Sequence, residues 1–511
     1  MRHKLSRGVT AAVVMTLLVP QPAQSQREPA AGGARNPVQR SQCRTPAALP
    51  DLGSEAGVPP FDVQVPYATM EARAIKDKGA PPPPPVAAPP MAVSAADSTA
   101  SEAIVAAGSR IDRGERTTAA DKSASDSPVD AKVGPRRPRP YPQRQSGLLT
   151  AGEHDDLLNP ELYAAYVRRS DLGQQIADLP QLDTARILTV EIKDFAGNPL
   201  GRSLVEVQCA DGNRLLLQTM SDGTVTLFPG LDNLSPSVKV RALNQDWRVV
   251  TIPRGAGGQR ITFTSNAVAV MAPPKLDLML AIDTTGSMGD EIRYLQSELA
   301  AILDAIRTRH PGLDIRVGFV FYRDVGDDYV TNTVPLTRDF AAAQGALAQR
   351  YAGGGGDYPE AMDQALVRAA RQDWRRDAVK SLLLVADAPP HDENMGMAWR
   401  AAEHLRANRV HIVAVAASGV ADKAEYAMRA MAALTQSRYL FLTDDSGVGN
   451  SHAAPAIDCY LVTRLDALLR RVIDSQIAGR RIEPKDSEVI REVGQYDRGR
   501  CIIPRSRLPE Q

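Results

Sequence analysis

The sequence predicts a multidomain protein, in which an α/β domain with a doubly wound parallel sheet follows a small antiparallel β-sandwich and a disordered arm. Three observations support this fold class. Apolar strands alternate with amphipathic helices over residues 275–480, the pattern of a parallel sheet covered by helices. Short segments of period two fill residues 184–268, as in a sandwich. Residues 26–144 are rich in Ala, Pro, Ser and charge, and such composition does not build a core.

The first 25 residues predict a signal peptide. A basic start precedes an apolar stretch from Val9 to Pro20, and the small residues Ala23 and Ser25 suit a signal peptidase, so we expect cleavage after Ser25. An uncleaved anchor is the alternative. No later stretch reaches the roughly 18 apolar residues that span a bilayer. We therefore expect an exported protein, periplasmic or secreted, with no transmembrane segment after signal cleavage.

The next segments connect this signal to the folded domains. The arm contains APPPPPVAAPP and is expected to act as an extended spacer or, alternatively, to bind a partner. Residues 145–183 predict a helical connecting segment, because Asn159 can cap a helix with Pro160 at its first position.

Residues 184–268 predict the sandwich, with strands at ILTVEI, SLVEVQCA, RLLLQTM, TVTLFPG, SVKVRAL, WRVVTI and RITFTS. The phrase VEIKDFAGNPLGRSLVEV, followed by SDGTVTLFPG, resembles carboxypeptidase-regulatory or transthyretin-like domains. This resemblance implies a structural stalk or, alternatively, a carbohydrate-like binding module.

Charge and cysteine content limit the function classes. The 60 basic and 60 acidic side chains cancel, so net charge gives no field that would favour nucleic-acid binding. The sequence also has no basic stripe with interleaved aromatic residues, and no nucleic-acid partner is expected. Four cysteines allow three pairings. We favour Cys459 with Cys501, which flank the last predicted helix, while Cys209 is expected to pair or to remain a buried core thiol. No Cys or His spacing indicates zinc.

The stretch LDLMLAIDTTGSMGDEI, residues 276–292, carries the chemistry. An apolar strand ends at Asp283, and a turn with Gly286 places the hydroxyls of Thr285 and Ser287 beside that carboxylate before a helix begins. Sites in α/β sheets lie at the carboxyl ends of strands. Three hard oxygen donors on one turn therefore predict a Mg²⁺ site.

Asp283, Thr285 and Ser287 match the D-x-[ST]-x-S signature of a metal-ion-dependent adhesion site, and residues 275–480 resemble a von Willebrand factor type A (VWA) domain. The resemblance implies a Rossmann-like fold, a non-enzymatic role, and bound Mg²⁺, with Mn²⁺ or Ca²⁺ as alternatives. It also implies two further metal loops. Asp387, which ends the strand SLLLVA, resembles the aspartate that holds a metal water in the family.

The second metal loop is YAGGGGDYPEAMDQAL. Its Gly355 and Gly356 allow the backbone to approach the metal closely. Asp357 stands where the family has a threonine, so the expected metal residues are Asp283, Thr285, Ser287, Asp357 and Asp387. With three carboxylates the metal-free site should be strained or partly protonated, and Asp357 should weaken capture of a partner's carboxylate. Alternatively, Asp357 and Glu360 form a capping box.

The remaining elements of the α/β domain follow the same alternation. The acidic residues Asp324, Asp327 and Asp328 either border the metal or form an ordinary acidic loop. Residues 481–511 are expected to form a C-terminal tail. We expect strands at DIRVGFVFYRD, an antiparallel edge YVTNTVPLT, RVHIVAVAAS and RYLFLTDD, and helices at 341–350, 359–371, 395–408, 421–435 and 460–477.

These features lead to competing functions. The first is a metal-dependent, adhesion-like module that binds a protein ligand through an acidic residue of that ligand. The second is an assembly or chaperone-like subunit of an envelope complex. The third is a serine hydrolase in which Ser287 acts with Asp387 and either His391 or His411, although Thr285 replaces the first glycine of G-x-S-x-G. Zinc proteolysis is less favoured still, because the seven histidines include no HExxH helix.

Overall fold

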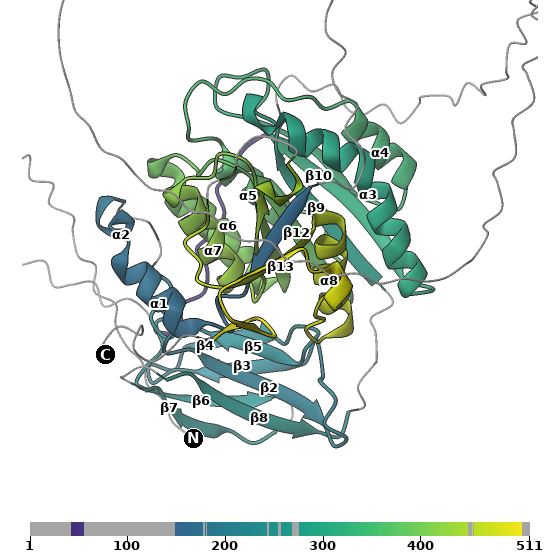
Figure 1. The fold of residues 1–511 in the computed structure, drawn as a ribbon. Coiled ribbons are helices and arrows are strands. Elements are labelled where there is room, and N and C mark those ends of the chain that lie inside the picture. The colour runs from purple at the N-terminus through teal and green to yellow at the C-terminus, as the bar shows by residue number, and fades with distance from the viewer. Residues whose placement is uncertain are drawn as a thin grey trace, which may run out of the picture.

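A computed structural model of the protein describes residues 42–55 and 149–502, with gaps at 177–178, 180, 243–244, 254–256, 268–274, 448–451 and 453. The expected signal peptide and most of the expected arm lie outside these residues. Figure 1 shows an α/β domain beside a smaller β domain. No helix among the described residues is long and apolar enough to cross a membrane.

The α/β domain is built on a nine-stranded sheet of order β11-β10-β9-β12-β13-β14-β1-β15-β16. The five strands from β10 to β14 in this order are parallel, and the strands on either side pair antiparallel. The predicted antiparallel edge strand is confirmed as β11. The strands are β1 (Thr150–His154), β9 (Lys275–Asp283), β10 (Asp314–Tyr322), β11 (Thr331–Thr337), β12 (Val379–Ala386), β13 (Val410–Ala416), β14 (Tyr439–Thr443), β15 (Tyr460–Arg464) and β16 (Arg491–Val493).

Helices cover both faces of this sheet (Figure 1). Along β9, Leu278 and Leu280 join a core that includes residues of α3, α4 and α8, whereas Met279 and Ala281 join one that includes residues of α5, α6 and α7. Successive side chains of a strand point to opposite faces, so the continuous apolar run fills two cores and the domain is doubly wound. The helices are α3 (Gly289–Arg309), α4 (Phe340–Ala348), α5 (Met362–Ala370), α6 (Met395–Ala407), α7 (Asp422–Leu434) and α8 (Leu465–Ala478).

The β domain has a strand at each of the seven predicted segments. A three-stranded sheet, β5-β2-β8, and a four-stranded sheet, β4-β3-β6-β7, share one apolar core. The sandwich is not wholly antiparallel as predicted, because β2 and β8 pair in parallel. The strands are β2 (Leu188–Asp194), β3 (Leu204–Gln208), β4 (Arg214–Gln218), β5 (Thr224–Leu227), β6 (Ser237–Ala242), β7 (Arg248–Thr251) and β8 (Gln259–Ser265).

The segment expected to be only a helical connection contributes a strand to the main sheet. β1 lies between β14 and β15 and precedes α1 (Pro160–Arg169) and the short α2 (Leu172–Gln175). Its Gly152 faces an aromatic ring, since a Cβ there would lie 2.4 Å from Phe441 Cζ. The sequence prediction failed because TAGEH lacks the apolar run of a buried strand. The β domain is therefore inserted between two strands of one sheet.

The C-terminal region is also more ordered than predicted. A helix was expected at 460–477, but the first part of this range forms the strand β15, and α8 starts after it. Tyr460 and Val462 of β15 lie in the core. The described part of the expected tail contains β16, β17 (Tyr496–Asp497) and β18 (Arg500–Cys501). Cys501 is disulfide-bonded to Cys459. The favoured pair is thus the one seen, and it holds this region against the domain.

Residues 42–55, assigned from composition to the disordered arm, instead lie across both domains. Cys43 is disulfide-bonded to Cys209 of the β domain, so Cys209 is not a free core thiol. Arg44 pairs with Glu403 of α6. Glu55 accepts hydrogen bonds from the Thr333 backbone N–H and hydroxyl on β11, at 2.9 and 2.6 Å. This segment is held in place by contacts with residues that are distant in the sequence. Amino-acid composition cannot reveal such contacts.

Candidate metal centre

The first loop of the site follows directly from the end of β9. Asp283 is fully buried, and its Oδ1 accepts hydrogen bonds from the backbone N–H and hydroxyl of Thr285, at 2.9 and 2.7 Å. Its Oδ2 is buried without a hydrogen-bond partner among the described residues. An unsatisfied buried carboxylate oxygen is unfavourable. The strand end therefore presents one acceptor that a cation or a proton would satisfy.

The glycine loop is held against this first loop through its backbone. Gly286 N–H donates to Gly354 O at 3.2 Å, and Gly353 N–H donates to Thr284 O at 3.0 Å. Gly354 and Gly355 have φ of 79° and 72°, a region in which side chains are disfavoured. Gly356 does not have to be glycine for steric reasons, since no atom lies within 4 Å of a Cβ built there.

Asp327 fixes the glycine loop from the opposite side. Its Oδ2 accepts the Gly355 N–H at 2.9 Å and the Asp324 N–H at 3.1 Å. Asp324 pairs with His391 at 2.7 Å, and Asp328 pairs with Arg323 at 3.3 Å. The acidic loop after β10 thus borders the site, where Asp327 positions the backbone of the glycine loop.

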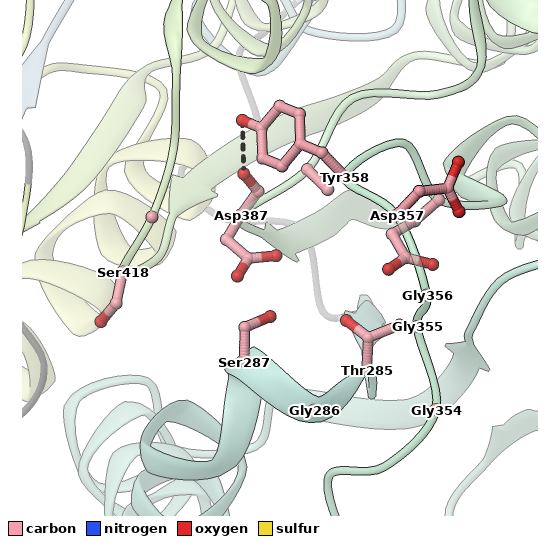
Figure 2. Close-up of a pocket in the computed structure, with 13 residues that line it drawn as sticks. Thr285, Gly286, Ser287, Gly354, Gly355, Gly356, Asp357, Tyr358, Asp387 and Ser418 are labelled. Atoms are coloured by element: carbon pink, nitrogen blue, oxygen red, sulfur yellow. Dashed lines mark hydrogen bonds between the residues drawn. The ribbon is translucent and has the colours of Figure 1, made fainter.

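The third loop begins at Asp387, directly after β12. Asp387 is buried, and it accepts a hydrogen bond from the Ser287 hydroxyl. Tyr358 crosses from the glycine loop: its hydroxyl donates to Asp387 O at 3.0 Å and accepts from Ala421 N–H at 2.8 Å. Figure 2 shows the first of these two bonds. Tyr358 therefore joins the second loop to the third.

These loops surround a cavity of about 520 Å³. The structure brings all five predicted metal residues to it, with Thr285, Ser287, Asp357 and Asp387 in its lining and Asp283 buried behind Thr285. In Figure 2, Ser287 lies directly below the Asp387 carboxylate, with Asp357 farther along the glycine loop. Asp357 is exposed. The capping-box alternative is wrong, because α5 starts at Met362 with Ala361 as N-cap and no side-chain cap.

Sequence reasoning missed Glu360 as a site residue. Glu360 lines the same cavity, only 3% of its surface is exposed, and its Oε2 is buried without a hydrogen-bond partner among the described residues. It was considered only as a capping partner. No sequence signal separated it from Asp357, because the helix was expected at 359–371, which placed Glu360 inside it, whereas α5 begins only at Met362.

Burial and mutual repulsion control the charges at this centre. Burial, followed by the charge of Asp387, raises the pKa of Asp283 to about 7. Burial, followed by the charges of Asp283, Asp324, Asp327 and Asp387, raises the pKa of Glu360 to about 9. These carboxyls hold protons near neutrality because their charges lack compensation. A cation would supply that compensation.

The residues fit a divalent cation that prefers oxygen ligands. Within the described parts of the chain, no three His, Cys, Asp or Glu side chains are grouped as metal ligands. A cation would therefore also use the Thr285 and Ser287 hydroxyls and water. Mg²⁺ is commonly bound through one or two carboxylates and retains several waters. Asp283 has the unsatisfied oxygen, and Asp387 can orient the Ser287 hydroxyl.

The serine-hydrolase alternative gains no support from the geometry. Among the described residues, no histidine is hydrogen-bonded to Ser287. A Ser–His–Asp arrangement does occur elsewhere, with Ser418 Oγ 3.0 Å from His452 Nε2 and His452 Nδ1 2.7 Å from Asp444 Oδ1. However, Ser418 Oγ also lies 2.8 Å from Glu291 Oε1 and points away from Ser287 and Asp387 (Figure 2). The network ties the loop after β13 to α3.

The raised pKa values predict how stability depends on pH. Above the ordinary carboxyl pKa values of 3.8 and 4.5, the folded metal-free protein binds more protons than the unfolded chain does, at Asp283 up to about pH 7 and at Glu360 up to about pH 9, because both folded pKa values are raised. Its stability should therefore fall as pH rises through this window. Melting temperatures measured with EDTA should fall, and those measured with Mg²⁺ should fall less. Equal slopes would show that these carboxyls are not coupled to a cation.

Comparison with known proteins agrees with this architecture. Residues 277–452, about a third of the chain, match the family model of the von Willebrand factor type A domain. The alpha-protein kinase vwkA of Dictyostelium discoideum is 30% identical over 126 residues, which cover 24% of this chain and 20% of that protein. The chain thus matches about a fifth of the length of this curated relative.

Two solved structures are also similar. The conserved hypothetical protein BatB from Bacteroides thetaiotaomicron is 14% identical, with a TM-score of 0.27, over 39% of this chain and 98% of that chain. The pilus adhesin SpaC from Lactobacillus rhamnosus GG, in its open conformation, is 15% identical, with a TM-score of 0.28, over 40% of this chain and 30% of that chain. The family match, together with the helix-covered sheet, shows that residues 277–452 of this chain are a von Willebrand factor type A domain.

Proposed function

We propose that the protein is a non-enzymatic, exported module that binds a protein ligand through a divalent cation, Mg²⁺ first and Mn²⁺ or Ca²⁺ as alternatives. The observation that carries this proposal is the unsatisfied Asp283 Oδ2 at the end of β9, behind a cavity lined by Thr285, Ser287 and Asp387. Oxygen donors on three loops suit cation capture. The cavity leaves room for a group that the ligand provides.

Electrostatics favour binding over chemistry at this site. A cation held by carboxylates loses part of its charge, which weakens its ability to activate water or a carbonyl. The same loss of charge weakens the attraction of the cation for an acidic residue of a ligand. We therefore expect the site to bind its cation more strongly than the bound cation attracts the ligand. The name of the kinase relative does not transfer to this chain, because the match covers a fifth of that protein.

The cysteines support export. All four are paired, Cys43 with Cys209 and Cys459 with Cys501. Such disulfides form and persist mainly in oxidising compartments, in agreement with the predicted signal peptide of residues 1–25. In this proposal the β domain, fixed to the α/β domain by residues 42–55, is a stalk that presents the metal face.

The test is a pull-down from the native envelope fraction with the full chain. We expect a protein partner that is captured with Mg²⁺, released by EDTA, and lost in Asp283→Ala and Ser287→Ala. Asp304→Ala is the matched control, since Asp304 is an exposed residue of α3 away from the site. Capture that persists equally in EDTA and in both site variants would show that the cation does not mediate binding.

The same experiment bears on the alternative of an envelope assembly subunit. An adhesive module should capture a surface or matrix component, whereas an assembly subunit should capture other members of one complex in fixed proportions. Identification of the captured proteins by mass spectrometry separates the two. Both outcomes would retain the cation-dependent site.

A further inference from the structure

We propose that Glu360, rather than Asp357, is the side chain by which the glycine loop completes the cation site. Asp283 and Glu360 would then be the two carboxylate ligands, the Thr285 and Ser287 hydroxyls neutral donors, and Asp387 a residue that acts through Ser287 and water. This inference rests on the proposed function, because it assigns a ligand to the same site.

The glycine loop leaves space for the Glu360 carboxylate beside the first loop. A Cβ on Gly355 would lie 2.8 Å from Glu360 Oε1 and 3.1 Å from Thr285 Cβ. The Glu360 carboxylate and the Thr285 side chain are therefore neighbours on the same side of Gly355. This places an oxygen of the second loop beside the first loop of the site.

Two acceptor oxygens at this place lack donors. Glu360 Oε2 and Asp283 Oδ2 are both buried without a hydrogen-bond partner among the described residues. Buried polar atoms are nearly always satisfied, and two unsatisfied carboxylate oxygens beside one cavity repel each other. A divalent cation between the loops would satisfy both. The Asp357 carboxylate does not need a cation to satisfy its oxygens, because it is exposed to solvent.

The backbone of Glu360 is fixed where a ligand would require it. Its N–H donates to Pro389 O at 3.0 Å, and Glu360 forms an isolated parallel bridge with Pro390. The next residue, Ala361, donates to Arg323 O at 3.2 Å. Glu360 is therefore attached to the third loop, close to Asp387, and to the end of β10. Such attachment pre-organises a ligand and reduces the entropy lost on binding.

The helix explains why Glu360 has no competing structural role. Because α5 begins at Met362 with Ala361 as its N-cap, the Glu360 side chain is not used to cap it. Asp327 already holds the Gly355 N–H at 2.9 Å, so Glu360 is not needed to fix the glycine turn either. Its buried Oε2 has no hydrogen-bond partner among the described residues, which is unfavourable for the metal-free fold and is expected of a residue that binds a cation.

The experiment compares Glu360→Gln with Asp357→Asn in the full chain. Both substitutions replace a carboxyl that can ionise with a neutral amide and retain the side-chain shape. Mn²⁺ binding is followed by electron paramagnetic resonance, and Mg²⁺ binding by calorimetry. We expect Glu360→Gln to weaken cation affinity about tenfold or more, and Asp357→Asn to change it by less than about threefold. Circular dichroism melting checks that each variant is folded, and Glu360→Gln should melt no lower than the wild type in EDTA.

The outcomes separate this inference from the proposed function. If Asp357→Asn loses the cation and Glu360→Gln does not, Asp357 is the ligand and the inference is wrong. If neither variant changes affinity while Asp283→Asn abolishes it, the inference fails and the cation site stands. If Asp283→Asn also binds normally, the proposed function fails as well.

Discussion

Replacing Glu153 by alanine is expected to lower the free energy of unfolding by about 3–5 kcal/mol, the range for breaking a buried ion pair. Glu153 on β1 is 1% exposed and lies 2.7 Å from Arg438, 3.1 Å from Arg471 and 3.5 Å from Arg481. Burial alone would raise the pKa of Glu153, but the three guanidiniums hold it well below its usual range. The variant would leave these cations without their shared counter-charge.

Chemical denaturation followed by circular dichroism measures this effect. Glu161→Ala is the control, because Glu161 is exposed on α1, and surface changes usually stay within about 0.5 kcal/mol. In the wild type the contribution of Glu153 should be lost as pH falls below the ordinary value of 4.5, because its folded pKa is lowered. A loss below about 1 kcal/mol in Glu153→Ala would show that water replaces the carboxylate.

Replacing Gly355 by alanine should weaken Mg²⁺ binding by about 10- to 100-fold, which corresponds to about 1.4–2.8 kcal/mol. Two causes act together. The φ of 72° at Gly355 is disfavoured for alanine, and the new Cβ would lie 2.8 Å from Glu360 Oε1. The loop would have to move away from Thr285, which separates the second loop from the first.

Gly356→Ala is a matched control for this variant. It adds the same methyl group to the adjacent residue, but nothing lies within 4 Å of a Cβ there. Its Mg²⁺ affinity, measured by calorimetry, should stay within about threefold of the wild type. If both alanine variants bind Mg²⁺ equally well, the glycine loop does not form part of the cation site.

Much of the α/β domain could be predicted from sequence because its signals are local. The apolar run of β9 and the helical spacing of α3 each report burial within one element, and the structure has both. Asp283, Thr285 and Ser287 were found for the same reason, since they share one turn. The choice between Asp357 and Glu360 could not be read in this way, because it depends on the path of the chain through Gly354 and Gly355.

The sequence by itself determined the alternation of strands and helices, the strands of the β domain and the turn that begins the cation site, because each follows from periodicity within a few residues. Tertiary structure alone decided the position of β1, the attachment of residues 42–55 and the Cys43–Cys209 bond. These features depend on partners more than 100 residues away, such as Arg438 for Glu153. Local hydrophobic pattern does not encode such partners, because polar residues like Glu153 are stabilised in the core only by what the rest of the chain brings to them.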